Sequence, residues 1–214
     1  MTVAAVVVAG GRGVRFGGPK QFSLLDDETI AARSVRASRS VAHFVALVVP
    51  QDYAGLGEGA DVVVCGGDTR AASVRAGLQA LPLCDVVVVH DAARPLASAD
   101  LFAAVVRAVE SGADAAIPGL SVTDTVKRIV SRDGRAVVVG TVDRSDLVTV
   151  QTPQAFRRDI LERAHAGLSE ATDDAALVEA AGGTVVVVAG EIRNLKITEP
   201  SDLERIVAAL EADV

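Results

Sequence analysis

Hydrophobic residues along this chain gather in short, almost continuous runs rather than in alternation with polar residues. Valine and alanine dominate the runs, and polar or glycine-containing segments separate them. Runs of this kind are typical of strands covered on both faces, which is the usual state of a parallel sheet. The sequence therefore predicts strands at Val3–Ala9, Phe44–Val49, Asp61–Cys65, Asp85–His90, Ala113–Pro118 and Thr184–Ala189.

Between these runs, hydrophobic residues recur at helical spacing. The predicted helices are Thr29–Ser40, Thr69–Leu81, Ala97–Glu110, Arg157–His165, Asp173–Ala181 and Ser201–Ala212. Asp68 or Thr69 is suited to cap one helix, Ser98 another, and Pro200 opens the last. Strand alternating with helix predicts an α/β fold with right-handed crossovers. We expect a Rossmann-like three-layer sandwich with a mostly parallel, twisted sheet.

Residues 121–150 interrupt this alternation. Ser121–Ile129 and Ala136–Val142 are rich in β-forming residues, and Ser131–Gly134 between them is a turn signal. The segment predicts a β-hairpin arm that projects from the sandwich. Because a lone two-stranded hairpin is only marginally stable in water, we expect the arm to pack on a second subunit.

Composition narrows the class of protein. The 214 residues suit one domain, 1–214, and the formal net charge of −7 argues against a nucleic-acid partner. Cys65 and Cys84 lie beside valine runs and are expected to be buried thiols, without disulfide or metal-ligand spacing. No targeting signal or long apolar span is visible, so we expect a cytoplasmic protein without a membrane partner.

A glycine- and arginine-rich loop, residues 9–21, directly follows the first predicted strand. In open α/β sheets, ligands bind beyond the carboxyl ends of the strands. Glycines let backbone amides approach an anion, and Arg12, Arg15 and Lys20 add positive charge. The spacing fits neither the dinucleotide fingerprint, which would need glycine at Phe16, nor the P-loop, because Gln21 follows the lysine. The loop therefore indicates a polyphosphate site of another kind.

Two further strand ends carry polar groups. The 65–70 segment combines close-approach glycines with Asp68 and Arg70, which suits a flat base. Asp91, just past a buried strand, needs either a metal or a cation, and an Asp91–Arg94 structural pair is the alternative. Among the histidines, His90 is expected to be structural, whereas His43 and His165 are expected at the surface or its boundary.

Lysine is scarce in this chain. Of 21 basic residues, only Lys20, Lys127 and Lys196 are lysines. Lysine is a compact point charge suited to a single phosphoryl centre, so Lys20 and Lys196 are predicted to converge on one phosphate. Lys196 lies in Arg193–Thr198, which is predicted to be a short late strand, while Lys127 on the arm is expected to be structural or solvated.

Taken together, these segments resemble the 2-C-methyl-D-erythritol 4-phosphate cytidylyltransferase family. The resemblance covers nearly the whole chain and rests on segments in the family's order. They are residues 9–15 with Pro19–Gln21, Gly66–Asp68 with Arg70 and Ser73, His90–Pro95, Asp124–Lys127, Thr141–Arg144, Gln151–Gln154, Thr172–Asp173 and Asn194–Thr198.

The resemblance implies a single nucleotidyltransferase domain that acts as a homodimer, with each arm reaching over the partner's site. It implies CTP and a small polyol phosphate as substrates and a divalent cation, normally Mg²⁺, near Asp91. Its implied catalytic residues are Arg15, Lys20 and Lys196; its nucleotide-binding residues Ala9, Gly10, Gly11, Arg12, Gly13, Gly67, Asp68, Ser73 and Asp91; and its acceptor-binding residues Arg94, Thr125, Arg144 and Thr172.

The implied reaction is attack of the acceptor's phosphate on the α-phosphorus of CTP. The second pKa of a phosphate monoester is about 6, so the attacking group is already charged and needs no general base. This fits a sequence without a Ser-His-Asp or Cys-His arrangement. Two alternatives stay open: a cytidylyltransferase for ribitol 5-phosphate or a related polyol phosphate, and a non-catalytic nucleotide-binding module.

Overall fold

A mostly parallel sheet forms the centre of the body in the computed structural model, which describes residues 1–11, 13, 16–167 and 171–211. Within these residues the sheet has eight strands in the order β10-β7-β11-β6-β1-β4-β5, with β12 beside β7. β10 and β11 run antiparallel to β7, and the other pairs apart from β11–β6 are parallel. The strands are β1 Val3–Val8, β4 Phe44–Val49, β5 Val62–Cys65, β6 Val86–Asp91, β7 Ala115–Ser121, β10 Val148–Val150, β11 Gln154–Arg157 and β12 Val185–Ala189.

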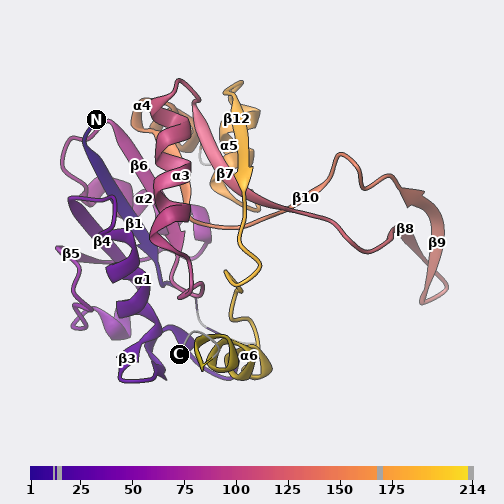
Figure 1. Ribbon diagram of the computed structural model, residues 1–214, viewed down its shortest axis with the longest axis horizontal. Coiled ribbons are helices and arrows are strands. Elements are labelled where there is room, and N and C mark those ends of the chain that lie inside the picture. The colour runs from indigo at the N-terminus through magenta and orange to yellow at the C-terminus, as the bar shows by residue number, and fades with distance from the viewer. Residues whose placement is uncertain (12, 14–15, 168–170, 212–214) are drawn as a thin grey trace.

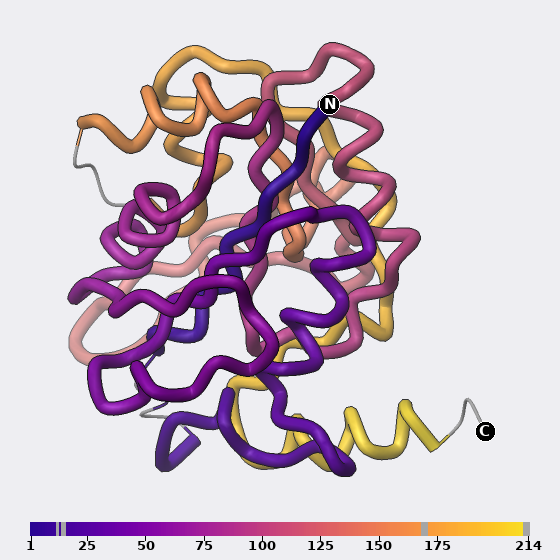
Figure 2. The backbone as a smooth tube through the Cα atoms, turned by 90° about the vertical axis from the view of Figure 1, so that its left-hand side faces the viewer, coloured from indigo at the N-terminus to yellow at the C-terminus, as the bar shows by residue number. Residues whose placement is uncertain are grey.

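Helices cover both faces of the sheet (Figures 1 and 2). Alternate residues of β1 enter different cores: Ala5 and Val7 pack under α1 (Ile30–Ser38) and α3 (Ala99–Glu110). Ala4 and Val6 pack under α2 (Arg70–Ala80), α4 (Arg158–Ala166) and α5 (Asp174–Ala180). The predicted three-layer sandwich is therefore confirmed. None of the described helices is long and apolar enough to cross a membrane.

A smaller cluster joins the C-terminal helix to the region after the first loop. α6 (Pro200–Glu211) lies beside the β2–β3 hairpin (Leu24–Leu25 and Glu28–Thr29) at the lower end of the molecule (Figure 2). Leu25, Ile30, Ile197 and Ile206 form its buried core. Short 3₁₀ helices at Lys20–Phe22 and Gln51–Tyr53 complete the body.

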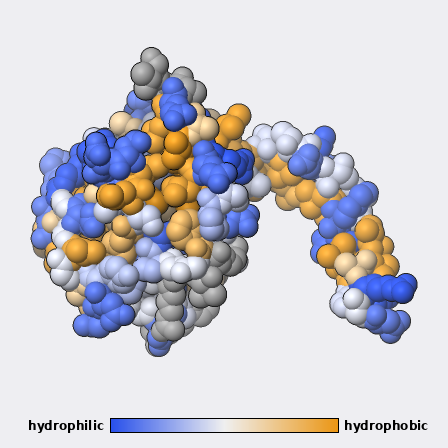
Figure 3. All heavy atoms as spheres, turned by 90° about the horizontal axis from the view of Figure 1, so that it is seen from below, coloured by the Kyte–Doolittle hydropathy of each residue, from blue (hydrophilic) through white to orange (hydrophobic). Residues whose placement is uncertain are grey.

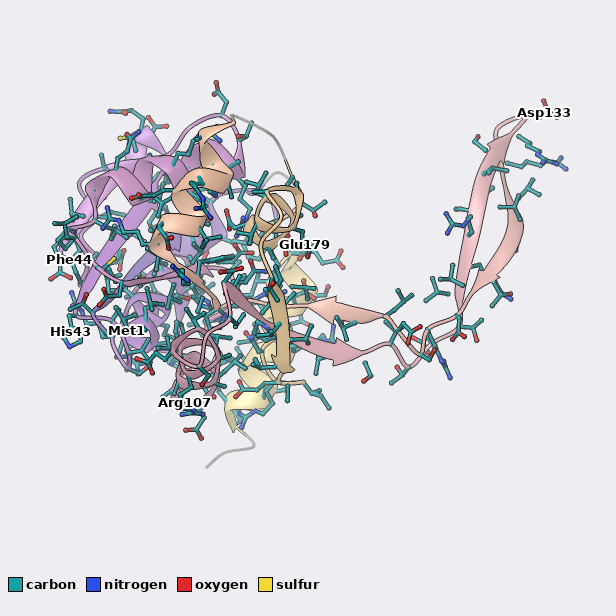
Figure 4. All side chains as sticks on the ribbon, turned by 90° about the horizontal axis from the view of Figure 1, so that it is seen from above. Met1, His43, Phe44, Arg107, Asp133 and Glu179 are labelled. Carbon is teal, nitrogen blue, oxygen red and sulfur yellow. The ribbon has the colours of Figure 1, made fainter. Side chains whose placement is uncertain are left out.

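The predicted hairpin arm is present and extends away from the body (Figure 1). β8 (Val126–Arg132) pairs with β9 (Arg135–Val142). Asp133 and Gly134 form the turn with φ of 50° and 74°, as a two-residue turn of type I′ requires. The strands therefore extend further towards the turn than predicted, and β8 begins at Val126 rather than Ser121. Hydrophobic residues recur along the arm's surface, and Asp133 marks its far tip (Figures 3 and 4).

Several local predictions were wrong. Arg193–Thr198 forms no strand in the described structure; the amide of Ile197 donates to the carbonyl of Ala93 instead of joining a ladder. His165 is buried, because α5 packs against its helix, whereas His43 is exposed as expected. Cys65 and Cys84 are free but only half-buried.

Two helix starts follow the predicted capping chemistry. Thr69, rather than Asp68, caps α2, and its hydroxyl accepts a hydrogen bond from the amide of Ala72 at 3.1 Å. Ser98 caps α3 by accepting from the amide of Leu101 at 3.1 Å.

Candidate active site

A pocket of about 320 Å³ opens at the carboxyl edge of the sheet, where β1, β5 and β6 end. This is where an open α/β sheet binds its ligands. The lining residues come from the first loop, the start of α2, the end of β6 and the segment before α6. They are Val8, Ala9, Gly10, Gly11, Gly13, Lys20, Gln21, Gly67, Asp68, Thr69, Arg70, Ser73, Asp91, Ala92, Ala93 and Lys196.

One side of the pocket is built from backbone packed around Ser73. A Cβ atom would lie 3.2 Å from the Ser73 hydroxyl at Gly10 and 2.7 Å from it at Gly66, so larger residues would displace the hydroxyl. The Ser73 Oγ donates to the carbonyl of Thr69 at 2.9 Å. Its lone pairs stay available to a ligand donor. This side therefore offers a narrow surface that suits a flat group.

The first loop folds back on itself. Gly13 has a φ of +62°, and its carbonyl accepts hydrogen bonds from the amides of Phe16, Gly17 and Gly18. A Cβ at Gly13 would meet the Gly18 carbonyl oxygen at 1.7 Å, so glycine is required there. The side chain of Gln21 fastens the loop's start by donating to the carbonyls of Ala9 (2.5 Å) and Gly11 (2.9 Å). We did not predict this role of Gln21.

The opposite side of the pocket carries charge. Asp91, at the end of β6, accepts from Arg70 Nε at 3.3 Å and from Lys196 Nζ at 2.6 Å. Burial alone would raise the pKa of the Asp91 carboxyl, but Arg70 and Lys196 hold it far below its usual range. Asp91 is therefore ionised at neutral pH. The alternative Asp91–Arg94 pair is wrong: in the described structure Arg70 and Lys196 are its ion-pair partners.

The charge network continues behind the pocket. Arg70 Nη1 donates to Asp174 Oδ2 at 2.6 Å, and the other Asp174 oxygen lies 2.9 Å from His165 Nε2. Burial would lower the pKa of Arg70, yet Asp91 and Asp174 together raise it. Sequence reasoning missed Asp174, whose partner Arg70 is 104 residues away, and with it His165, which contacts Asp174. Consecutive acids at Asp173 and Asp174 were the available signal.

His90 supports the backbone beneath Asp91. Its ring nitrogens lie 3.2 Å from the Arg94 carbonyl and 3.2 Å from the Thr152 hydroxyl, which in turn accepts from the Asp91 amide at 3.0 Å. Complete burial lowers the pKa of His90 to about 4, so the ring is neutral at pH 7. The predicted structural role of His90 is confirmed.

The pocket brings together most of the predicted nucleotide site. Lys20 and Lys196, 176 positions apart in the sequence, line the same pocket. The other predicted residues that line it are Ala9, Gly10, Gly11, Gly13, Gly67, Asp68, Ser73 and Asp91. The predicted contributions of Arg12 and Arg15 fall on residues outside the described part of the chain.

The predicted acceptor-binding residues are not part of this pocket. Thr125 and Arg144 lie exposed at the two sides of the arm, and Thr172 is exposed just before α5. Arg94 donates to the carbonyls of Asn194 (2.7 Å) and Val150 (3.4 Å), and burial lowers its pKa. The described pocket therefore includes none of the four predicted acceptor-binding residues.

The acidic groups of the pocket fit one particular mode of metal binding. Among the described residues there is no cluster of three or more potential metal ligands. Mg²⁺ usually takes one or two carboxylates together with substrate phosphates and water. Asp91 supplies one such carboxylate, so the pocket fits a metal ion brought mainly by a nucleotide.

Comparison with known proteins places this geometry in context. Residues 3–212 match the IspD family, 2-C-methyl-D-erythritol 4-phosphate cytidylyltransferase. The chain is 44% identical to the protein of that name from Streptomyces avermitilis, covering 97% of this chain and 91% of the relative. It also resembles the crystal structure of the protein of that name from Thermus thermophilus, with a TM-score of 0.81 and 36% identity over 99% and 100% of the two chains.

Some relatives are longer than this chain. A bifunctional enzyme IspD/IspF from Clavibacter michiganensis is 46% identical over 95% of this chain, which covers 53% of that relative. The chain thus spans about half the length of the bifunctional relatives it matches.

Proposed function

Because the chain belongs to the 2-C-methyl-D-erythritol 4-phosphate cytidylyltransferase family, we propose that its pocket transfers CMP from CTP to 2-C-methyl-D-erythritol 4-phosphate. The products are 4-diphosphocytidyl-2-C-methyl-D-erythritol and pyrophosphate, in the biosynthesis of isoprenoid precursors. The observation that carries the proposal is the convergence of Lys20, Lys196 and Asp91 beside two glycine loops in one pocket.

The base and the triphosphate of the nucleotide contact different sides of the pocket. Gly67, Asp68 and Ser73 hold cytosine, since the packed glycines leave a narrow surface with a donor and acceptors at its edge. The triphosphate lies along the first loop, where Ala9, Gly10, Gly11 and Gly13 supply backbone and Lys20 supplies charge. Arg12 and Arg15 belong to the same proposal on the strength of the sequence alone.

The chemistry is an in-line displacement at phosphorus. An oxygen of the acceptor's phosphate bonds to the α-phosphorus of CTP while the bond to the bridging oxygen of pyrophosphate breaks. The attacking phosphate is already largely dianionic at pH 7, so no side chain need remove a proton. Catalysis then consists of positioning and charge neutralisation. Lys20 and Lys196 stabilise the charge that grows on the transferred group, and Arg15 assists the leaving pyrophosphate.

A divalent cation, normally Mg²⁺, completes the charge balance. When bound it neutralises the triphosphate and favours departure of pyrophosphate. Asp91 would hold it together with the CTP phosphates, since this carboxylate is ionised and lies between two cations that the nucleotide can also engage. Removal of divalent ions with a chelator should abolish pyrophosphate release, and added Mg²⁺ should restore it.

The acceptor site is shared between two copies of the chain. Thr125 and Arg144 on the arm of one protomer, with Arg94 and Thr172 of the other, hold the acceptor phosphate and its hydroxyl groups. The exposed hydrophobic side chains of the arm support this homodimer, because an isolated hairpin gains little stability from its own contacts.

The decisive experiment measures pyrophosphate release with CTP and each candidate acceptor. Rapid release with 2-C-methyl-D-erythritol 4-phosphate, and slow release with ribitol 5-phosphate, is the expected result. The reverse preference would assign the related polyol-phosphate reaction. Tight CTP binding without release for any acceptor would overturn the catalytic proposal in favour of a nucleotide-binding module. The expected cytoplasmic location belongs to the same proposal and is tested by cell fractionation.

A further inference from the structure

Lys196 reaches the pocket from a segment that no strand or helix holds. Residues 190–198 lie between β12 and α6 and form no strand, although the amide of Gly190 donates to the carbonyl of Gly119 in β7 at 2.9 Å. Within this segment, Lys196 pairs with Asp91 at 2.6 Å, and the amide of Ile197 donates to the carbonyl of Ala93. Side-chain contacts therefore supply much of the order that regular hydrogen bonding provides elsewhere.

The side chain of Gln151 grips this segment from the sheet. Its Nε2 donates to the carbonyl of Glu191 at 2.8 Å and to that of Asn194 at 3.3 Å. Its Oε1 accepts from the amide of Glu191 at 3.0 Å and from Asn194 Nδ2 at 3.4 Å. The carboxamide thus pairs with the main chain of Glu191 as a neighbouring strand would.

Gln151 is itself firmly placed. It follows β10 directly, its amide donates to the carbonyl of Pro118 in β7 at 2.9 Å, and its side chain is buried. The Asn194 side chain, fully buried, adds a second tie by donating to the carbonyl of Thr152 at 2.9 Å. The turn at 191–194 is therefore fixed to the sheet, and Lys196 lies only two residues beyond it.

We propose that Gln151 is a positioning residue for Lys196: its carboxamide replaces a missing strand pair and sets the direction from which Lys196 enters the pocket. The inference deepens the proposed function, on which the catalytic role of Lys196 rests. Gln151 does not line the pocket, so it acts on the reaction only through the segment it holds.

The test uses Gln151→Glu, which keeps the size of the side chain. A carboxylate oxygen replaces the amide nitrogen and faces the carbonyls of Glu191 and Asn194, so both donated hydrogen bonds are lost and repulsion takes their place. We expect kcat to fall on the order of tenfold or more, a loss of about 1.4 kcal/mol per factor of ten. The KM for CTP should stay within about twofold, since the base side of the pocket is untouched. Gln79→Glu, the same change at an exposed position of α2, is the matched control.

Lysine scarcity provides a readout that does not depend on activity. The chain has only Lys20, Lys127 and Lys196, so labelling with an amine-acylating reagent followed by peptide mass spectrometry resolves each one. In Gln151→Glu, the labelling of Lys196 should rise severalfold relative to Lys127 on the arm, because Lys196 leaves its contact with Asp91. The Gln79→Glu control should label like the wild type.

Each outcome bears on the inference. A folded Gln151→Glu protein with unchanged Lys196 labelling and unchanged kcat would overturn it. If Gln151→Glu fails to fold, Gln151→Met removes the four hydrogen bonds without adding charge and is tested in the same way. Failure of both variants to fold would overturn a positioning role in favour of a purely structural one. Altered Lys196 labelling with normal kcat would support the placement by Gln151 and instead refute the catalytic role of Lys196, so the two failures are distinguishable.

Discussion

Valine dominates both β6 in the body and β9 in the arm, yet these strands differ sharply in exposure. Val86 to Val89 of β6 are fully buried, whereas Val138 and Val139 of β9 are 58% and 45% exposed. Both strands have a high β propensity, but β6 is covered by helices on each face and β9 by neither. Similar local preferences thus build a buried core in one region and an exposed hydrophobic surface in the other.

The chemistry divides in the same way. Charged groups in the body pair with one another over long sequence distances, as in Lys196–Asp91 and Arg70–Asp174. In the described part of the chain, no hydrogen bond or ion pair joins residues 126–142 to the body. Under the proposed function, the body carries the nucleotide pocket, while the arm carries groups that act in the site of a second protomer.

The largest effect should follow from removing a pocket lysine. Lys196→Ala or Lys20→Ala is expected to lower kcat about 10²–10³-fold, as loss of one donor to a developing charge does. Pyrophosphate release at saturating substrates measures it, with Arg107→Ala, at an exposed position of α3, as the control. A variant with near-normal kcat would remove that lysine from the proposed mechanism.

A smaller effect, on the free energy of unfolding, should follow from neutralising the buried acid behind the pocket. Asp174→Asn weakens the support of Arg70 and is expected to reduce the free energy of unfolding by about 1.5–3 kcal/mol, the worth of a hydrogen bond to a charged group. Asp133→Asn at the arm's turn should change it by less than about 0.5 kcal/mol, because asparagine tolerates the same backbone conformation. Denaturant titration of both variants makes the comparison; equal losses would contradict the division between body and arm.

Mixing two defective proteins tests whether the arm completes a neighbour's site. Lys20→Ala damages the pocket and Arg144→Ala damages the arm, so each homodimer should be poorly active. Random exchange places both lesions on one site of each mixed dimer and leaves the other site intact, restoring about a quarter of wild-type activity. No recovery in dimers shown to be mixed would refute the shared site.

The smallest effect is expected on the arm's own surface. Val138→Thr should change the unfolding free energy by less than about 0.5 kcal/mol when protein is dilute enough for dimers to separate. Val88→Thr in β6 should cost about 1–3 kcal/mol, because it buries a hydroxyl without a partner. Measuring both by denaturant titration sharpens the comparison. A large loss at Val138 in dilute protein would mean that the arm packs on its own body.

The sequence predicts those parts of the molecule that local pattern determines. Continuous valine-rich runs identify β1, β4 and β6, and Thr69 and Ser98 indicate where the helices that they cap begin. The glycine loops and the scarce lysines identify most of the residues that line the pocket. Hydrophobic periodicity also finds the helix that carries His165, but not the face on which this histidine is buried.

Prediction fails where placement depends on contacts between distant segments. Arg193–Thr198 has the composition of a strand, yet no neighbour offers it a ladder in the described structure, and Gln151 holds its beginning instead. Arg70 contacts Asp174, and Asp174 contacts His165, only because α2, α4 and α5 pack together. Such partners have no fixed spacing in the sequence.

The extension of the arm away from the body of its own protomer has a kinetic consequence. Under the proposed function, a lone protomer binds CTP but lacks the second clamp for the acceptor. Turnover per chain then depends on how many chains are present: on dilution, specific activity falls with the fraction of dimers, while nucleotide binding per chain stays constant. The rate per chain would then depend on the concentration of the protein itself, in addition to the concentrations of its substrates.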